Sequence, residues 1–244
     1  MSIRAVIFDV YGTLLEVGPP PIDAAERWEQ LWRELLGGPA RLSLPEFSAA
    51  CDRLVAREHA AARAVGIAHP EVSWPTLATE VVFELAHLPE ELRADFLFRQ
   101  TQLWHTVQLM PGAAEVLREL KRGHRIMGIA SNAQGYTLRE LDDTLGTSGL
   151  TRDLFSGPLC FWSFEAGFAK PDPHVFRWLT ARLQERHIPP NETLMVGDRL
   201  DNDVAPAQAQ GWRTWHLTIP SSHDGSGHGD WSELLNYLSA DNSD

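Results

Sequence analysis

The chain of 244 residues is poor in several residue types, and each shortage excludes a class of protein. There are only two cysteines, Cys51 and Cys160, and neither lies in a CxxC or Cys/His spacing. The sequence therefore predicts neither a disulfide framework nor a zinc site. Basic residues number 21 against 33 acidic ones, and no run of Lys or Arg is interleaved with aromatic residues. We therefore expect no nucleic-acid partner.

Long hydrophobic runs are also missing. The apolar stretches are far shorter than the ~20 residues that a membrane-spanning helix needs, and the N-terminus enters a strand pattern without a signal-peptide profile. We therefore expect no membrane association and a cytoplasmic location. Hydrophobic residues still make up 43% of the chain, which is enough for a substantial core in one domain with a large insertion or in two modest domains.

The order of the expected elements indicates an α/β fold. Residues 4–9 form a continuous apolar run, which is typical of a strand buried on both faces of a parallel sheet. From residue 111 onward, strand and helix signals alternate. The expected strands are 125–130, 158–162, 193–197 and 214–217, and the expected helices include 113–122, 174–186 and 205–210. This alternation predicts a Rossmann-like, doubly wound parallel sheet.

A helical block without strand signals interrupts this pattern between residues 18 and about 105. Its four amphipathic helices predict a small bundle, and two of them open with capping-box spacings, at Asp23 and at Ser43. Trp28 and Trp32 share one helical face and are assigned to the packing of this bundle. The predicted division is a core of residues 1–17 and 108–238, a four-helix cap of 18–107 and a disordered tail of 239–244. Residues 220–230 are predicted to form a mobile loop that exposes His223 and His228.

Polar residues that terminate apolar strands mark the candidate site, because ligands of open α/β sheets bind outside the carboxyl ends of the strands. The residues in question are Asp9 to Thr13, Ser131 with Asn132, Lys170, and Asp198 with Asp203. They offer a carboxylate nucleophile, hydroxyl and amide donors, a cation, and carboxylates able to hold Mg²⁺. Such a set suits displacement at an electrophile that carries negative charge.

These residues lie in four motifs, DVYGT, SN, KPDP and GDRLDND, which follow one another in that order. In this respect the sequence resembles the haloacid dehalogenase superfamily, a group of aspartyl-nucleophile hydrolases with a Rossmann-like core and a mobile cap. The resemblance extends from the first strand to about Leu217, and the helical block matches the family's cap in position and size. It implies a small-molecule substrate.

The resemblance also implies a role for each motif residue. Asp9 would be the nucleophile that forms a covalent intermediate, and Thr13 and Ser131 would hydrogen-bond the transferred group. Asn132 would orient the substrate or the surroundings of the nucleophile. Lys170 would neutralise the negative charge shared by Asp9 and a bound anion.

A Mg²⁺ site is implied by the same motifs. Asp198 would bind the ion directly, and Asp203 would act through water or by positioning the other ligands. Asp9 and the backbone carbonyl of Tyr11 would complete the protein ligands. A simpler alternative for Asp203 is that it caps a helix beginning near Val204.

Tyr11 departs from the pattern of the family's phosphatases, which carry DxD where this chain has DVY. In those enzymes the second Asp protonates the leaving oxygen and later activates water. A phenol, with an ordinary pKa near ~10, is a poor acid at neutral pH, and loss of a positioned general acid can cost roughly 10²–10⁴-fold in rate. Three alternatives follow.

The first alternative is a metal-independent 2-haloacid dehalogenase, since that branch resembles DxYGT and a halide leaves without a proton. The tripeptide LWR at residues 31–33 looks like a segment that supplies a halide-contacting arginine, although Arg33 alone reads as a surface cation. Dehalogenases carry Ser and Asn in the fourth motif and a Tyr after KPD, where this chain has GDRLDND and Phe176. Asp198 would also repel a carboxylate substrate.

The second alternative is a Mg²⁺-dependent phosphohydrolase acting on a small phosphorylated metabolite with a good leaving group, such as an acyl phosphate, a phosphoanhydride or an aryl phosphate. The fourth motif favours this prediction. The third alternative is a binding or regulatory protein that has lost catalysis. The sequence indicates neither the substrate itself nor the oligomeric state.

Overall fold

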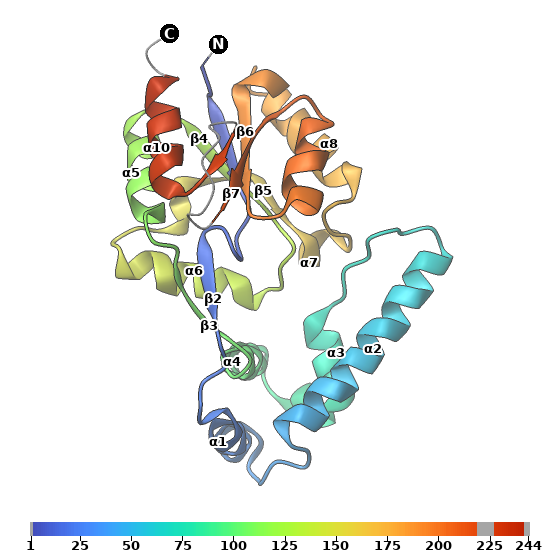
Figure 1. Cartoon of the computed structure of the whole chain (residues 1–244). Helices are drawn as coiled ribbons and strands as arrows, with labels where there is room; N and C mark the ends of the chain where they lie inside the picture. The colour runs from blue at the N-terminus through green and yellow to red at the C-terminus, as the bar shows by residue number, and fades with distance from the viewer. Residues whose placement is uncertain (1, 219–226, 242–244) are drawn as a thin grey trace.

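A six-stranded parallel sheet forms the centre of the core in the computed structural model, which describes residues 2–218 and 227–241 (Figure 1). The strand order is β5-β4-β1-β6-β7-β8. The strands are β1 (Ala5–Phe8), β4 (Ile126–Ser131), β5 (Phe155–Trp162), β6 (Thr193–Gly197), β7 (Arg213–Leu217) and β8 (His228–Gly229). Strand β1 is central, paired with β4 and β6, and its four side chains are buried in the apolar clusters on the two faces of the sheet, which explains its continuous apolar sequence.

Helices cover both faces of this sheet, so the predicted doubly wound core is confirmed (Figure 1). The core helices are α5 (Ala113–Arg122), α6 (Tyr136–Thr147), α7 (Ser163–Ala166), α8 (Pro173–Gln184), α9 (Ala205–Gln208) and α10 (Trp231–Ala240). Helices α5, α6 and α10 contribute to the apolar cluster on one face, and α8 and α9 contribute to the cluster on the other. The sequence patterns above do not predict α6 or α7.

The inserted block contains α1 (Ala24–Leu36), α2 (Leu44–Ala64), α3 (Trp74–Val81) and α4 (Glu90–Thr101), as expected for a helical cap. These helices enclose an aromatic cluster of their own, in which the Trp28 ring packs against Trp32, Phe47 and Phe96. The capping box at Ser43 is present. The one predicted at Asp23 is wrong, because that side chain makes no cap hydrogen bond.

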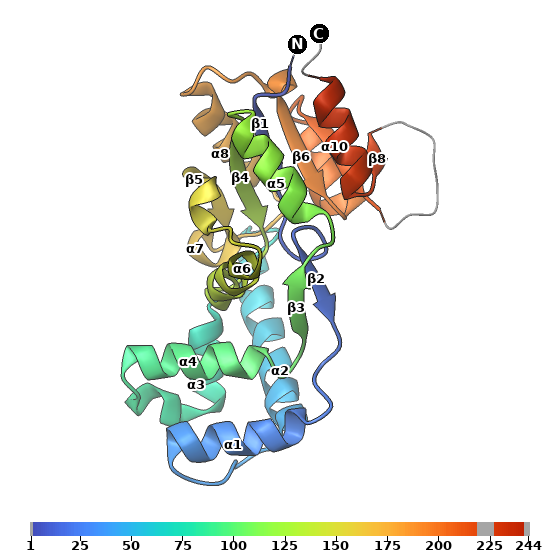
Figure 2. The same cartoon turned by 90° about the vertical axis from the view of Figure 1, so that its left-hand side faces the viewer.

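A two-stranded antiparallel ribbon joins the cap to the core (Figure 2). Strand β2 (Leu15–Gly18) leads into the cap, and β3 (Thr106–Leu109) leads out of it, with Leu15 opposite Leu109. The sequence patterns do not predict either strand, because each has only four residues and alternates between buried or half-buried and exposed positions too briefly to show a period. The predicted cap bounds at residues 18 and 107 therefore fall inside this ribbon.

The cap meets the core a second time through the loop between α2 and α3. An antiparallel bridge joins Pro70 to Phe168, in the segment that leads into the KPDP motif. The Glu71 carboxylate accepts hydrogen bonds from Gln134 Nε2 at 2.9 Å and from Ser163 Oγ at 2.6 Å. The cap is thus hydrogen-bonded to the core loops that follow two of the sheet's strands.

The C-terminal predictions need correction. Helix α10 continues to Ala240, and Asp241 pairs with Arg213 at 2.7 Å, so the predicted disordered tail begins too early. His228 is half-buried in β8 rather than exposed in a loop. His223 and residues 242–244 lie outside the described residues. Within the described ranges, no helix is both long and apolar enough to cross a membrane.

The aromatic cluster generates the first prediction. Replacing Trp28, which is 1% exposed, by Ala should lower the free energy of unfolding by about 3–5 kcal/mol, because it leaves a cavity and an unpaired Leu42 carbonyl that now accepts from the indole. Trp178→Ala is the control, since Trp178 lies on α8 and is 38% exposed. Urea unfolding followed by circular dichroism measures both. Equal losses in the two variants would show that the cap cluster contributes no special stability.

Candidate active site

Asp9 lies directly beyond the carboxyl end of β1 and is 8% exposed. Its backbone N–H donates to the Val196 carbonyl of β6 at 3.0 Å, which anchors the start of the loop that follows. Gly12 in that loop has a φ of 78°, and a side chain there would collide with the Asp198 carboxylate. The glycine of the first motif therefore allows the Asp9 loop to pack directly onto the fourth motif.

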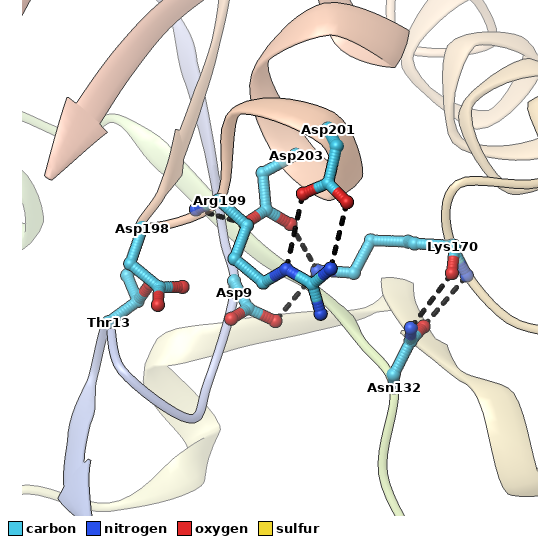
Figure 3. A network of polar contacts seen from close by, with 8 residues as sticks. All are labelled: Asp9, Thr13, Asn132, Lys170, Asp198, Arg199, Asp201 and Asp203. Atoms are coloured by element: carbon cyan, nitrogen blue, oxygen red, sulfur yellow. Dashed lines mark hydrogen bonds and ion pairs between the residues drawn. The ribbon is translucent and has the colours of Figure 1, made fainter.

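Lys170 connects the other motifs to Asp9. Its ammonium, on a residue only 3% exposed, donates to Asp9 Oδ1 at 2.7 Å and to Asp203 Oδ1 at 2.5 Å (Figure 3). The Asn132 amide holds the lysine backbone, accepting from Lys170 N at 2.7 Å and donating to Lys170 O at 2.9 Å. Asn132 therefore orients the lysine, and among the described residues its side chain makes no hydrogen bond to Asp9. Asp172, two residues on, caps α8.

The fourth motif follows β6. Asp198 accepts a long hydrogen bond from Thr13 Oγ1, at 3.4 Å. Asp203 lies in a π-helical turn, Leu200–Val204, and its Oδ2 accepts from the Arg199 N–H at 3.1 Å. Because that side chain is directed back to Arg199, Asp203 does not cap the following helix, and the simpler alternative for this residue is wrong. Asp201 is exposed and forms an ion pair with Arg199.

Three carboxylates converge at this point. Asp9, Asp198 and Asp203 each place one ligand atom within 4.8 Å of the other two. Burial raises the pKa of Asp9 to about 6, against the opposing effect of Lys170, and burial together with Asp203 also raises the pKa of Asp198. Burial lowers the pKa of Lys170, but the two adjacent carboxylates outweigh it and keep the amine charged.

Three acids beside one ammonium leave an excess of negative charge in a site where Asp9, Asp203 and Lys170 are buried. Hard oxygen ligands and uncompensated negative charge are what a divalent cation such as Mg²⁺ requires, so the donor set fits this ion. The cluster lies at the carboxyl ends of β1 and β6, the edge of the sheet at which the sequence predicts the site.

Ser131 ends β4, the strand beside β1. The parallel register places Phe8 opposite Ile129, so Ser131 lies level with the start of the Asp9 loop. Its hydroxyl is buried and has no hydrogen-bond partner within the described part of the chain. A buried, unpartnered donor is rare in folded proteins and is available to an oxygen of a bound substrate.

Tyr11 is the site residue whose placement differs most from expectation. Its hydroxyl donates to Glu140 Oε2 at 2.5 Å and lies 2.7 Å from Thr137 Oγ1, both on α6. Burial, followed by the nearby Glu140 charge, raises the pKa of Tyr11 well above its ordinary value, so the phenol stays protonated at neutral pH. The side chain is therefore committed to α6. Nothing in the sequence patterns indicates Glu140.

Two residues weighed for dehalogenase chemistry lie outside this constellation. Arg33 is exposed on α1, where it approaches Glu29 to 3.7 Å, as expected for a helix-surface cation. Phe176, four residues after the KPD motif, is fully buried and packs against the Trp212 ring.

Comparison with known proteins gives relatives of both chemistries. The chain is 26% identical over 202 residues to (S)-2-haloacid dehalogenase 4A of Burkholderia cepacia. The aligned region covers 80% of this chain and 74% of the relative. It is 28% identical over 131 residues to the glyceraldehyde 3-phosphate phosphatase of Pyrococcus furiosus, covering 54% and 51% of the two chains.

Solved structures support the fold. A 2-haloacid dehalogenase from Pseudomonas syringae pv. Tomato DC3000 aligns with a TM-score of 0.63 at 22% identity, over 98% of this chain and 99% of the other. A HAD phosphatase from Thermococcus onnurineus aligns with a TM-score of 0.56 at 20% identity, over 97% and 98%. The family model described as "haloacid dehalogenase-like hydrolase" matches residues 3–211. Because this match spans most of the chain, from β1 to beyond α9, the protein belongs to the haloacid dehalogenase-like hydrolases.

Proposed function

We propose that this hydrolase is a Mg²⁺-dependent phosphohydrolase that uses Asp9 as its nucleophile and acts on a small phosphorylated metabolite. The observation that carries the proposal is the convergence of Asp9, Asp198 and Asp203 within 4.8 Å around a single lysine. A metal site needs these carboxylates. A 2-haloacid, by contrast, brings a carboxylate of its own into a cluster that already has an excess of negative charge.

Asp9, Asp198 and the Tyr11 backbone carbonyl would hold the Mg²⁺ ion, with Asp203 acting through water or by positioning the other ligands. When bound, the ion would offset the charge on the phosphoryl oxygens and reduce their repulsion from the nucleophile. Asp203 is already engaged by Lys170 and by the Arg199 N–H, so its orientation is fixed without the metal.

The protein groups divide the remaining work. An Asp9 carboxylate oxygen forms a bond to phosphorus as the bond to the leaving oxygen breaks, and the leaving group departs with the bonding pair. Lys170 stabilises the ionised nucleophile and the charge that gathers on the phosphoryl oxygens. The free Ser131 hydroxyl donates to one of those oxygens, and Thr13 supports Asp198. Water then hydrolyses the aspartyl phosphate.

The leaving group receives no proton from residue 11, because the Tyr11 hydroxyl is held by α6 and its pKa is raised. Substrates whose leaving group is already a weak base lose least from this absence. Acyl phosphates, phosphoanhydrides and aryl phosphates are therefore the proposed substrate classes.

Hydrolysis of 2-haloacids is a second candidate, and the Burkholderia cepacia dehalogenase favours it because its similarity to this chain covers more of both chains than that of the Pyrococcus furiosus phosphatase. A halide leaves without a proton, so the placement of Tyr11 is compatible with this chemistry. The charge of Asp198 opposes it. Loss of catalysis, the third alternative, is favoured by no observation, since Asp9 and Lys170 remain in contact.

One substrate panel separates these functions. Para-nitrophenyl phosphate, acetyl phosphate and 2-chloropropionate are each incubated with Mg²⁺ and with EDTA, and release of phosphate or chloride is measured. We expect phosphate release that requires Mg²⁺ and is abolished by Asp9→Asn. Chloride release that persists in EDTA would instead establish the dehalogenase. Absence of turnover with Mg²⁺ bound would support a binding protein.

The missing acid generates a further prediction. Across a series of phosphates, kcat/KM should rise steeply as the leaving group becomes less basic, with alkyl phosphates slower than aryl or acyl phosphates by roughly 10²–10⁴-fold. Initial rates under identical Mg²⁺ conditions measure this. Equal rates for alkyl, aryl and acyl phosphates would show that another group supplies the proton.

Metal binding should depend on pH through Asp9. Its pKa is about 6 in the folded, metal-free protein, so below that pH Mg²⁺ must displace a proton, and apparent affinity should fall roughly tenfold per pH unit. Above pH 7, where Asp9 is already ionised, the affinity should level off. Isothermal titration calorimetry between pH 5 and 8 measures this. Asp201→Asn, in the segment that carries Asp198 and Asp203, is the control and should leave the profile unchanged. An affinity that does not depend on pH would remove Asp9 from the metal site.

A further inference from the structure

Glu140 of α6 is a buried carboxylate at which three parts of the chain meet. Its side chain is 0% exposed. One oxygen accepts from the Tyr11 hydroxyl at 2.5 Å. The other accepts from Gln102 Nε2 at 2.6 Å and lies 2.9 Å from His105 Nε2. No lysine or arginine pairs with it among the described residues, so the carboxylate depends on these polar partners.

The partners of Glu140 come from both connections between core and cap. Tyr11 belongs to the Asp9 loop, which passes directly into β2, since the Gly12 N–H donates to the Leu15 carbonyl at 2.8 Å. Gln102 and His105 form the stretch between α4 and β3, where the chain leaves the cap. Glu140 thus touches the residues that precede each strand of the ribbon, and Figure 2 shows α6 lying beside that ribbon.

The tyrosine ring reinforces this arrangement. It meets the His105 ring edge-on, with centroids 6.0 Å apart, and its hydroxyl also lies against Thr137 of α6. An aspartate at position 11 would be too short to span this distance, and a second carboxylate beside Glu140 would repel it. The residue that departs from the phosphatase pattern is therefore the one that this buried carboxylate requires.

We propose that Tyr11 is a positioning residue, which, by binding Glu140, fixes the Asp9 loop relative to the segment through which the cap is attached. The position of the nucleophile and the position of the cap are then set by the same carboxylate. The inference rests on the proposed role of Asp9 as nucleophile, but not on whether phosphate or a haloacid is the substrate.

Tyr11→Phe tests the coupling, because it removes the hydroxyl and keeps the ring and the backbone carbonyl. We expect kcat to fall roughly 10- to 10²-fold with little change in KM, since a small displacement of the nucleophile affects the transition state more than binding. Amide hydrogen exchange should become faster at residues 10–15 and also at 102–109. The matched control is Tyr237→Phe, a half-buried tyrosine on α10 that packs against the Trp215 ring away from the cap, and it should change neither readout.

Variants of Glu140 complete the test. Glu140→Gln retains an oxygen that accepts from the Tyr11 hydroxyl. Its new amide can donate to Gln102 once the Gln102 amide rotates, so this variant should keep most of the wild-type kcat. Glu140→Ala should reproduce both defects of Tyr11→Phe. If Tyr11→Phe does not fold, the contrast between Gln and Ala at position 140 decides the question.

Wild-type exchange in Tyr11→Phe, or faster exchange at residues 10–15 alone, would show that the tyrosine does not couple the loop to the cap. Turnover is measured with whichever substrate of the panel reacts. The exchange experiment needs no substrate, so failure of the proposed phosphohydrolase function and failure of this inference give different results.

Discussion

The shared contact of Lys170 with Asp9 and Asp203 is the interaction on which the rest of the site depends. The two carboxylates lie on segments almost two hundred residues apart in the chain, and both are buried. Without the ammonium between them they would repel each other in a region of low dielectric. The fold fixes this ammonium through its backbone, because the Asn132 amide pairs with both backbone polar groups of Lys170. The residue that follows β4, Asn132, thus serves to position the Lys170 side chain.

The attachment of the cap follows a different physical principle. The cap and the core each enclose their own apolar cluster, and two acidic side chains accept hydrogen bonds across the boundary between them. Glu140 of the core accepts from Gln102, and Glu71 of the cap accepts from Gln134 and Ser163. Separation of such polar contacts exposes groups that water can satisfy. An interface of this kind permits relative motion far more readily than one built from apolar side chains.

Sequence patterns predicted the core well because its elements carry their signals locally. The apolar run of β1 is continuous since both faces are covered, and the residue that ends it is the acid of the site. The ribbon was missed because four-residue strands show no period. Helix α6 carries Leu138, Leu141 and Leu145 at a helical spacing, and the last two are fully buried. This short pattern lies between two predicted strands and was not assigned to a helix.

The local sequence pattern does not predict the direction in which a site side chain points. Tyr11 follows Asp9 by two residues, so proximity in sequence suggested a role in the same reaction. In the folded chain its hydroxyl is directed to α6, where it donates a hydrogen bond to the Glu140 carboxylate. Glu140 itself is one of many acidic residues in the sequence. Its burial, with only 1% of the residue exposed, cannot be inferred without knowing that the Asp9 loop and the cap connection both pack against it.

This placement changes what residue 11 says about chemistry. A tyrosine whose hydroxyl is held elsewhere neither donates a proton to a leaving alkoxide nor contacts a halide, so its presence is equally compatible with phosphate and haloacid hydrolysis. The nucleophile and its lysine serve both reactions as well. Asp198 is where the two chemistries differ, because its carboxylate lies beside Asp9 and Asp203, where a metal ion would be favourable and a substrate carboxylate unfavourable. For this chain, the fourth motif rather than the first therefore favours phosphoryl transfer.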